Sequence, residues 1–125
     1  MNKGKGVKFL GDHYITVRGN TFFYSKSGTG DPVVLLHGIP THSGLWEGVI
    51  PWLEDSFSTY SFDLLGFGKS SKPLSHELHL KYQAELLTEA IDKLELKEFV
   101  LVGHDIGGGI GQIMAVQNHS PVKAL

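Results

Sequence analysis

One stretch of the chain, residues 100–109, carries the side chain best suited to chemistry. It starts as a short, wholly apolar run, which predicts a buried strand, and the residues from about Gly107 to His119 can form a helix. A strand that enters a helix through one tight turn holds the residue at the turn, Asp105, in a strained backbone conformation above the carboxyl end of the strand. Because aspartate is ionised at neutral pH, it can attack carbon without a base to deprotonate it. The stretch therefore predicts a nucleophilic carboxylate.

The glycines around Asp105 distinguish this interpretation from a simpler one, in which Asp105 only caps the helix that follows. Aspartate is a good N-cap. However, each of the glycines at positions 107, 108, 109 and 111 costs a helix about 1 kcal/mol relative to alanine, so close packing of the backbone has to justify them. Gly103 and Gly107 fit such packing, since a Cβ on either side would collide across so sharp a turn. We therefore favour the nucleophile over the cap.

The residues of this turn also resemble a known family. They are similar to the nucleophile elbow of the α/β-hydrolase fold, in the branch where aspartate replaces serine, as in epoxide hydrolases and haloalkane dehalogenases. The resemblance extends from about Asp12 to Leu125 and covers the N-terminal half of the family's fold. It implies that Asp105 is the nucleophile. The residues that it assigns to support of the elbow are Gly103, His104, Gly107 and Gly108.

A second motif of the same family, His-Gly-x-Pro, follows a buried apolar run and consists of His37, Gly38, Ile39 and Pro40. In the family, this turn supplies one main-chain N–H of the oxyanion hole, and the residue after the nucleophile supplies the other. The resemblance therefore implies that Ile39 and Ile106 hold the oxyanion. Pro40 biases Ile39 toward an extended conformation, which fixes the direction of its N–H. A hydrogen bond to the backbone explains His37 better than catalysis does, so we assign His37, Gly38 and Pro40 to support of the loop.

The resemblance implies hydrolysis of an epoxide or a carbon–halogen bond, in a small-molecule substrate, through an alkyl ester on Asp105 that a histidine-activated water then attacks. Many relatives have tryptophan directly after the nucleophile, where this chain has Ile106, so the choice between epoxide and halide stays open. The family places its acid and its histidine after the nucleophile. The predicted helix takes up most of the 20 residues that follow Asp105, and His119 lies at the far end of that helix. Because the acid and the histidine have so little chain in which to follow Asp105, it stays open whether this chain completes a catalytic turnover.

Two alternatives to this activity stay open. The chain can be a catalytically incomplete hydrolase fragment that acts as a binding or partner-dependent module, or it can catalyse a cofactor-free reaction of the same fold without Asp105 as nucleophile. The strand that leads to Asp105 is expected to be an apolar edge of the sheet, which residues 122–125 are too few to cover. Because such edges promote association, we expect self-association or a partner there.

Alternating strands and helices indicate an α/β fold with a mostly parallel sheet. The resemblance assigns it the N-terminal strands of an α/β-hydrolase sheet, without the cap and the C-terminal part. Residues 1–11 are expected to form a flexible lead-in and residues 12–125 a single domain. The predicted strands span residues 13–18 and 21–26, joined by a turn at Gly19 and Asn20, and then residues 32–36, 57–62, 99–102 and 121–125. Helices are predicted over residues 43–53, 80–94 and about 107–118.

Composition excludes several classes of partner. The formal net charge of −2 gives no reason to expect nucleic acid, and no apolar run is long enough to span a membrane. His76 and His79 could share a helix face, but no carboxylate or cysteine pattern completes a metal site. The run Gly68–Ser70 is not a phosphate loop, because Asp63 stands where that loop needs glycine. We expect no metal and no cofactor, and the absence of cysteine and of a signal peptide predicts a cytoplasmic protein.

Overall fold

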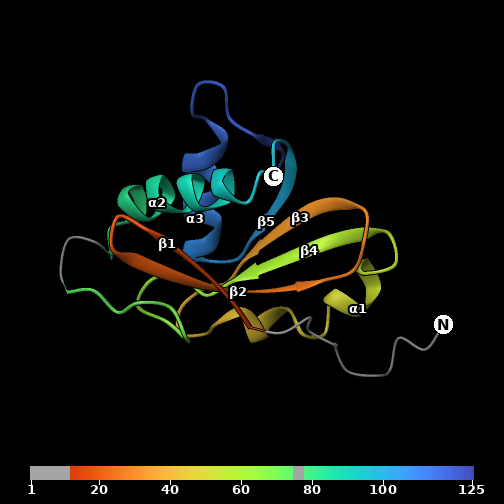
Figure 1. Cartoon of the computed structure of the whole chain (residues 1–125), viewed down its shortest axis with the longest axis horizontal. Coiled ribbons are helices and arrows are strands. Elements are labelled where there is room, and N and C mark those ends of the chain that lie inside the picture. Colours follow the sequence, from red (N-terminus) through yellow and green to blue (C-terminus); the bar gives the residue numbers. More distant parts are fainter. Residues whose placement is uncertain (1–11, 75–77) are drawn as a thin grey trace.

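The computed structural model describes residues 12–74 and 78–125. These residues form a six-stranded sheet with helices on both faces, so the predicted α/β fold is confirmed (Figure 1). The expected lead-in, residues 1–11, and His76 lie outside the described residues. In chain order the elements are β1 (Asp12–Val17), β2 (Asn20–Ser27), β3 (Asp31–Leu36), the short 3-10 helix η1 (Ser43–Trp46), α1 (Ile50–Leu53), β4 (Phe57–Phe62), α2 (Leu80–Lys93), β5 (Phe99–Gly103), α3 (Ile106–Ala115) and β6 (Val122–Ala124).

The strands follow the spatial order β1-β2-β4-β3-β5-β6. β1 and β2 form an antiparallel hairpin, and β2 also pairs antiparallel with β4. β3 lies between β4 and β5 and is parallel to both. The carboxyl ends of these three strands therefore meet at one edge of the sheet, where open α/β sheets place their ligands.

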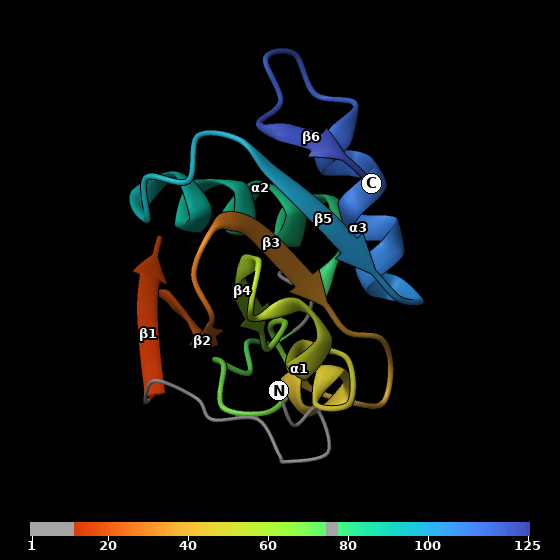
Figure 2. The same ribbon diagram turned by 90° about the vertical axis from the view of Figure 1, so that its right-hand side faces the viewer.

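The helices divide between the two faces of the sheet. α2 and α3 lie together on one face, and η1 and α1 lie on the other, as two perpendicular views show (Figures 1 and 2). The larger core lies between the sheet and the α2–α3 layer and includes Phe22, Phe62, Leu87, Ile91 and Ile110. The smaller core lies under η1 and α1 and includes Val33, Leu35, Trp46 and Ile50.

Two predicted helices differ from the structure. The single helix expected over residues 43–53 is broken into η1 and α1, because Pro51 lacks an N–H and fits only the first turn of a helix, where it stands in α1. Helix α3 ends at Ala115, short of the predicted residue 118. There the Ser120 hydroxyl donates a hydrogen bond of 2.7 Å to the carbonyl oxygen of Met114, and His119 adopts a positive φ of 58°.

The expected sheet edge also differs from the structure. β6 pairs in parallel with β5, so β5 is not the edge strand, although the recorded register joins β6 only to Phe99 and Val100. The hairpin turn lies one residue earlier than predicted, at Arg18 and Gly19, with φ of 49° and 80°. Two successive residues of positive φ produce the turn that matches the twist of a two-stranded hairpin.

Candidate active site

The turn between β5 and α3 has the strained geometry that the sequence predicts. Asp105 adopts φ 57° and ψ −122°, a conformation that costs a non-glycine residue about 1–3 kcal/mol. Its side chain is exposed and makes no hydrogen bond that caps α3. The main chain closes the turn instead, with N–H of Gly107 donating to the carbonyl of His104 at 2.9 Å. Asp105 therefore presents its carboxylate above the sheet edge.

Glycines allow this turn to pack tightly against its neighbours. A Cβ on Gly103 would lie 2.5 Å from the carbonyl oxygen of Gly107, and a Cβ on Gly107 would lie 2.7 Å from the carbonyl carbon of Leu36 at the end of β3. Gly108 differs from these two, because its nearest neighbour would be Gly103 O at 3.6 Å, an ordinary contact. The close approach at the elbow thus depends on Gly103 and Gly107, and Gly108 has room for a side chain.

The loop after β3 brings a main-chain donor to the carboxylate. The N–H of Ile39 donates a hydrogen bond of 3.0 Å to Oδ2 of Asp105. A Cβ on Gly38 would lie 2.5 Å from Cβ of Asp105, so the absence of a side chain at Gly38 makes this approach possible. The elbow is also tied to β3 directly, because the N–H of His104 donates to the carbonyl of Leu36 at 3.0 Å. Two segments that are 66 residues apart in sequence thus form one site.

Hydrogen-bond donors around Asp105 favour its charged form. The N–H of Ile39 has the largest effect and that of Ile106 the next; both lower the pKa of the Asp105 carboxyl below its ordinary value of 3.8. Desolvation by burial opposes this effect, and the smaller electrostatic influence of the neighbouring His104 acts in the same direction as the two N–H groups. The carboxylate is therefore ionised at neutral pH.

His37 is buried beneath this loop and binds two parts of the backbone. Its Nδ1 lies 3.0 Å from the carbonyl oxygen of Gly38, and the N–H of Leu64 donates to its Nε2 at 2.9 Å. This pattern assigns the proton of the ring to Nδ1. Burial lowers the pKa of His37, so the ring is neutral. The ring connects the loop after β3 to the loop after β4.

An apolar cavity of about 210 Å³ lies beside the elbow, a feature that the sequence analysis missed. Its walls include Ile39 and Ile106, whose N–H groups hydrogen-bond to the Asp105 carboxylate, whereas Asp105 itself does not line the cavity. We call this space the elbow cavity. The other residues that line it are Leu65, Gly66, Phe67, Leu78, Leu80 and Gln83. One feature of the sequence could have indicated this cavity, namely the apolar residues inside the glycine-rich loop that follows β4.

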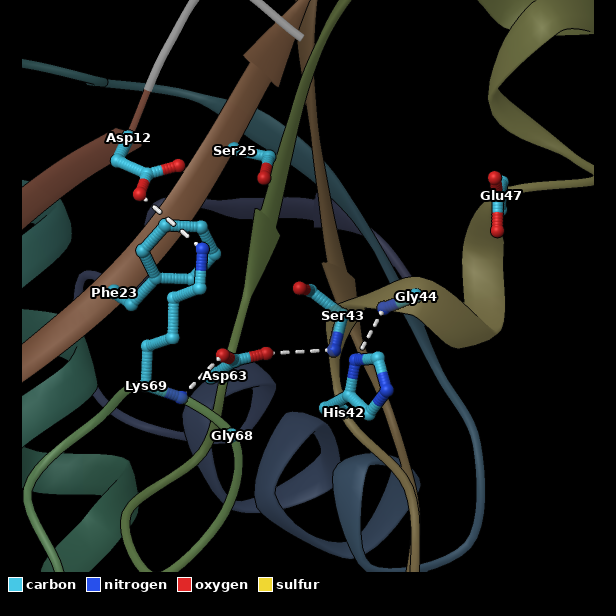
Figure 3. A pocket seen from close by; sticks show the side chains of 10 residues that line it. All are labelled: Asp12, Phe23, Ser25, His42, Ser43, Gly44, Glu47, Asp63, Gly68 and Lys69. Atoms are coloured by element: carbon cyan, nitrogen blue, oxygen red, sulfur yellow. Dashed lines mark hydrogen bonds and ion pairs between the residues drawn. The ribbon is translucent and has the colours of Figure 1, made fainter. Parts of the chain in front are cut away.

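A larger cavity of about 440 Å³ lies elsewhere, over β2, β4 and η1 (Figure 3). Charged side chains line it, and Asp105 does not. At its centre Asp63 is buried and accepts hydrogen bonds from the N–H groups of Ser43, at 2.6 Å, and Lys69, at 2.8 Å. Because both carboxylate oxygens hold the backbone of flanking loops, Asp63 organises the structure here.

Other candidate groups lie away from Asp105. His119 lines a different cavity, together with Glu85 and Asp92 on the outer side of α2. Within residues 12–74 and 78–125, no three histidine, cysteine or carboxylate side chains are grouped so that they could hold a metal ion. None of the helices in the described part of the chain is long and apolar enough to cross a membrane.

Comparison with known proteins places this site in a family. The alpha/beta hydrolase fold family matches residues 31–125. Haloalkane dehalogenase 2 of Mycobacterium tuberculosis is 35% identical over 102 residues, which are 82% of this chain and 36% of that protein. A soluble epoxide hydrolase of a Corynebacterium species is 33% identical over 113 residues, 90% of this chain and 39% of that protein.

Solved structures agree with these matches. The epoxide hydrolase CorEH, determined without ligand, has a TM-score of 0.85 and 32% identity to this chain, and the match covers 90% of this chain and 40% of CorEH. This chain thus spans roughly two fifths of the length of the relatives that it matches. With residues 31–125 matching the family, and with relatives of both predicted kinds, the chain belongs to the α/β-hydrolase fold family.

Proposed function

We propose that this chain carries the nucleophile and the oxyanion-binding loop of a hydrolase that opens an epoxide or a carbon–halogen bond through an alkyl ester on Asp105. The observation that carries the proposal is the exposed Asp105 carboxylate at a strained turn, with Oδ2 hydrogen-bonded to the N–H of Ile39. The names of its relatives, haloalkane dehalogenase and epoxide hydrolase, support the same reaction class.

In the first step, Oδ1 of Asp105 attacks a carbon of the substrate. A new C–O ester bond forms while the bond to the leaving atom breaks. A halide departs with the bonding electron pair; an epoxide oxygen stays attached as an alkoxide and takes a proton from water. Because the N–H of Ile39 already holds Oδ2, the proposal assigns the attack to the other oxygen, Oδ1.

In the second step, water attacks Cγ of the ester, and the carbonyl oxygen becomes an oxyanion. That oxygen is Oδ2, which already accepts a hydrogen bond from the N–H of Ile39. The N–H of Ile106 is a second donor to the Asp105 carboxyl. The intermediate expels the alcohol and regenerates the carboxylate. This step requires a base to take a proton from water, and the proposal assigns that role to no described residue of this chain.

Intact-mass spectrometry tests the proposal. The chain is incubated with epoxypropane, and peptide mapping locates the ester. We expect one adduct, of the full mass of the epoxide, on Asp105, and none in the Asp105→Asn variant. Asp31→Asn is the matched control, because Asp31 is also an exposed aspartate but lies at the opposite end of β3. Labelling at other carboxylates, or equal labelling of Asp105→Asn, would refute the proposal.

The fate of the adduct distinguishes the second candidate function. The proposal assigns the base for hydrolysis to no described residue, and His119 lies in another cavity. If the ester persists for hours on the protein, the chain by itself is a catalytically incomplete hydrolase fragment. If diol accumulates in excess over protein, the chain completes the reaction.

A further inference from the structure

The charged cavity over β2, β4 and η1 takes no part in the reaction proposed for Asp105 (Figure 3). Its volume of about 440 Å³ falls within the range of roughly 300–1,000 Å³ typical of sites for small molecules. Neither Asp105 nor the two isoleucines that donate to its carboxylate line this cavity. A molecule bound here therefore lies apart from the nucleophile.

Two buried serine hydroxyls face the cavity without a partner in the described part of the chain. Ser25 of β2 is 5% exposed and Ser43 of η1 is 7% exposed, and Figure 3 shows both hydroxyl oxygens pointing into the cavity. Among residues 12–74 and 78–125 neither hydroxyl makes a hydrogen bond, whereas the buried hydroxyl of Ser27, two residues further along β2, donates to Glu54 at 2.7 Å. Because a buried hydroxyl without a partner is unfavourable, the two serines indicate a polar group that enters from the cavity.

The sheet brings these hydroxyls together with the carboxylate of Asp63. Ser25 pairs with Ser61 of β4, and the Ser61 hydroxyl donates to the carbonyl of Ser43 at 3.1 Å. Asp63 accepts the N–H of Ser43 on one carboxylate oxygen and that of Lys69 on the other, and each oxygen keeps a further lone pair. Three oxygen acceptors thus face one space. A primary ammonium, which has three N–H donors, matches them.

The charges that line the cavity also favour a cation. Lys69 and Asp12 neutralise each other at one wall, where Nζ lies 3.2 Å from Oδ2. Asp63 and Glu47 have no such counter-cation, since no lysine, arginine or histidine in the described part of the chain forms an ion pair with either. Two carboxylates without a cation attract a positively charged ligand and repel an anion.

The position of Glu47 suits a ligand with a second positive charge. Glu47 follows Ser43 by four residues and lies at the end of η1. A 3-10 helix rises about 2.0 Å per residue, so these two residues lie about 8 Å apart along the helix axis. With single bonds of about 1.5 Å, an extended chain of about four or five carbons separates two nitrogens by about 6–8 Å. One nitrogen can therefore lie at the serines while the other lies at Glu47.

We propose that the charged cavity binds a short linear alkyldiamine as its dication. One ammonium donates to Ser25, Ser43 and Asp63, and the other lies at the carboxylate of Glu47. Both nitrogens are protonated at neutral pH, as the amine of a lysine side chain is. The inference goes beyond the proposed function and does not depend on the reaction at Asp105.

Titration of the whole chain with small ligands tests the chemical class, with the amide NMR signals of Ser25 and Ser43 as the readout. The series is 1,4-diaminobutane, butylamine, tetramethylammonium, butanol and potassium chloride, at neutral pH. We expect 1,4-diaminobutane to shift both signals saturably, with a dissociation constant of about 1 mM, and butylamine to bind about fivefold more weakly. Tetramethylammonium has the charge but no N–H, and butanol has the hydrogen bond but no charge, so neither should saturate.

Two results of this titration would refute the proposal. One is the absence of a saturable shift with 1,4-diaminobutane at about ten times the expected dissociation constant. The other is an equal response to tetramethylammonium or potassium ions, because it would show that the cavity attracts any cation without using N–H donors.

Serine variants test the contacts of the first ammonium. Ser25→Ala and Ser43→Ala should each weaken the binding of 1,4-diaminobutane about tenfold, because each removes an acceptor for a charged donor. Ser27→Ala is the matched control in β2 and should bind as wild type does, since its hydroxyl is engaged by Glu54. Asp63 is left unchanged because it holds two loops. An affinity that is the same in wild type and in both cavity variants would overturn the assignment.

Glu47→Gln tests the contact of the second ammonium. The advantage of 1,4-diaminobutane over butylamine should fall from about fivefold to about twofold, which is what two equivalent ends provide. Glu98→Gln, at an exposed carboxylate that lines another cavity, is the matched control and should keep the full advantage; equal effects of the two variants would refute the role of Glu47. Asp105→Asn should bind the diamine as wild type does, so this inference and the proposed function fail or stand separately.

Discussion

Replacing Gly107 by alanine tests how closely α3 packs against β3. The new Cβ would lie against the carbonyl oxygens of Leu36 and His37, with the carbonyl carbon of Leu36 at 2.7 Å, far inside the 3.4 Å at which ordinary contacts begin. These atoms cannot move away freely, because the carbonyl of Leu36 accepts the hydrogen bond from His104. The helix must therefore shift away from the strand, or its first turn must open.

The expected cost follows from two opposing effects. Alanine in place of glycine favours a helix by up to about 1 kcal/mol, whereas overpacking against fixed atoms costs about 1–3 kcal/mol or more. We expect a net loss of about 2 kcal/mol for Gly107→Ala. Gly108→Ala is the matched control in the same helix, because its Cβ has space, and it should gain about 0.5–1 kcal/mol.

Urea unfolding measures the difference between the two variants. With a slope of about 2 kcal/mol per M for a chain of this size, the expected gap of about 3 kcal/mol separates their midpoints by about 1.5 M. Gly107→Ala should also lose labelling of Asp105 by epoxypropane, since the elbow moves away from Ile39. Equal midpoints for the two variants would show that α3 does not approach β3 as closely as this structure has it.

Three further predictions concern charge. The labelling rate of Asp105 should stay constant from about pH 8 to about pH 5, because its pKa lies below 3.8; a rate that halves above pH 3.8 would contradict this. Burial lowers the pKa of His37 below 6.5, so below pH 6.5 the unfolded chain binds a proton that the folded chain does not. The stability advantage of wild type over His37→Gln should therefore shrink as the pH falls below 6.5. A difference in urea midpoint that stays constant between about pH 7.5 and about pH 5.5 would contradict this. Asp63→Asn should cost about 1–3 kcal/mol, because the two backbone N–H groups donate to different oxygens of Asp63 and the NH₂ group of asparagine would face one of these donors. Asp12→Asn, in an exposed ion pair, should cost less than about 1 kcal/mol; equal losses on urea unfolding would contradict this.

The central strands could be predicted from the sequence because burial dictates their composition. Strand β4 lies over Phe57–Phe62, as expected, and β3 and β5 differ from the expectation by a single residue at one end. A parallel strand covered on both faces must be apolar throughout, so the pattern and the structure have one physical cause. The strained conformation of Asp105 could also be predicted, since glycines on both sides of an aspartate fit a sharp turn.

Features that depend on one particular side-chain contact or on the pairing of two strands could not be predicted. The end of α3 depends on the hydroxyl of Ser120, and the pairing of β6 depends on β5, which lies about 20 residues earlier. The break before Pro51 could have been predicted from the sequence, because proline lacks an N–H and interrupts a helix unless it lies in the first turn. Gln83 could also have been noticed as a polar residue at a position that shares the inward face of α2 with Leu87.

The chemistry of the site depends on main-chain groups more than on side chains. Ile39 and Ile106 act on Asp105 through their N–H groups, so a different side chain at either position can keep the same main-chain hydrogen bond. In this chain the two isoleucines instead line the elbow cavity. A change of either side chain therefore alters the wall of the cavity and leaves the main-chain donors to Asp105 in place.

The loops that hold the nucleophile and the cavity form one connected unit. His37 binds the N–H of Leu64, and Gln83 binds the N–H of the next residue, Leu65. The same short stretch of backbone after β4 is thus fixed from one side by the loop after β3 and from the other by α2. Because a buried polar group that loses its partner is costly, neither contact can be released cheaply. The stretch can hold the cavity wall at a fixed distance from Asp105 only while both side chains are in place.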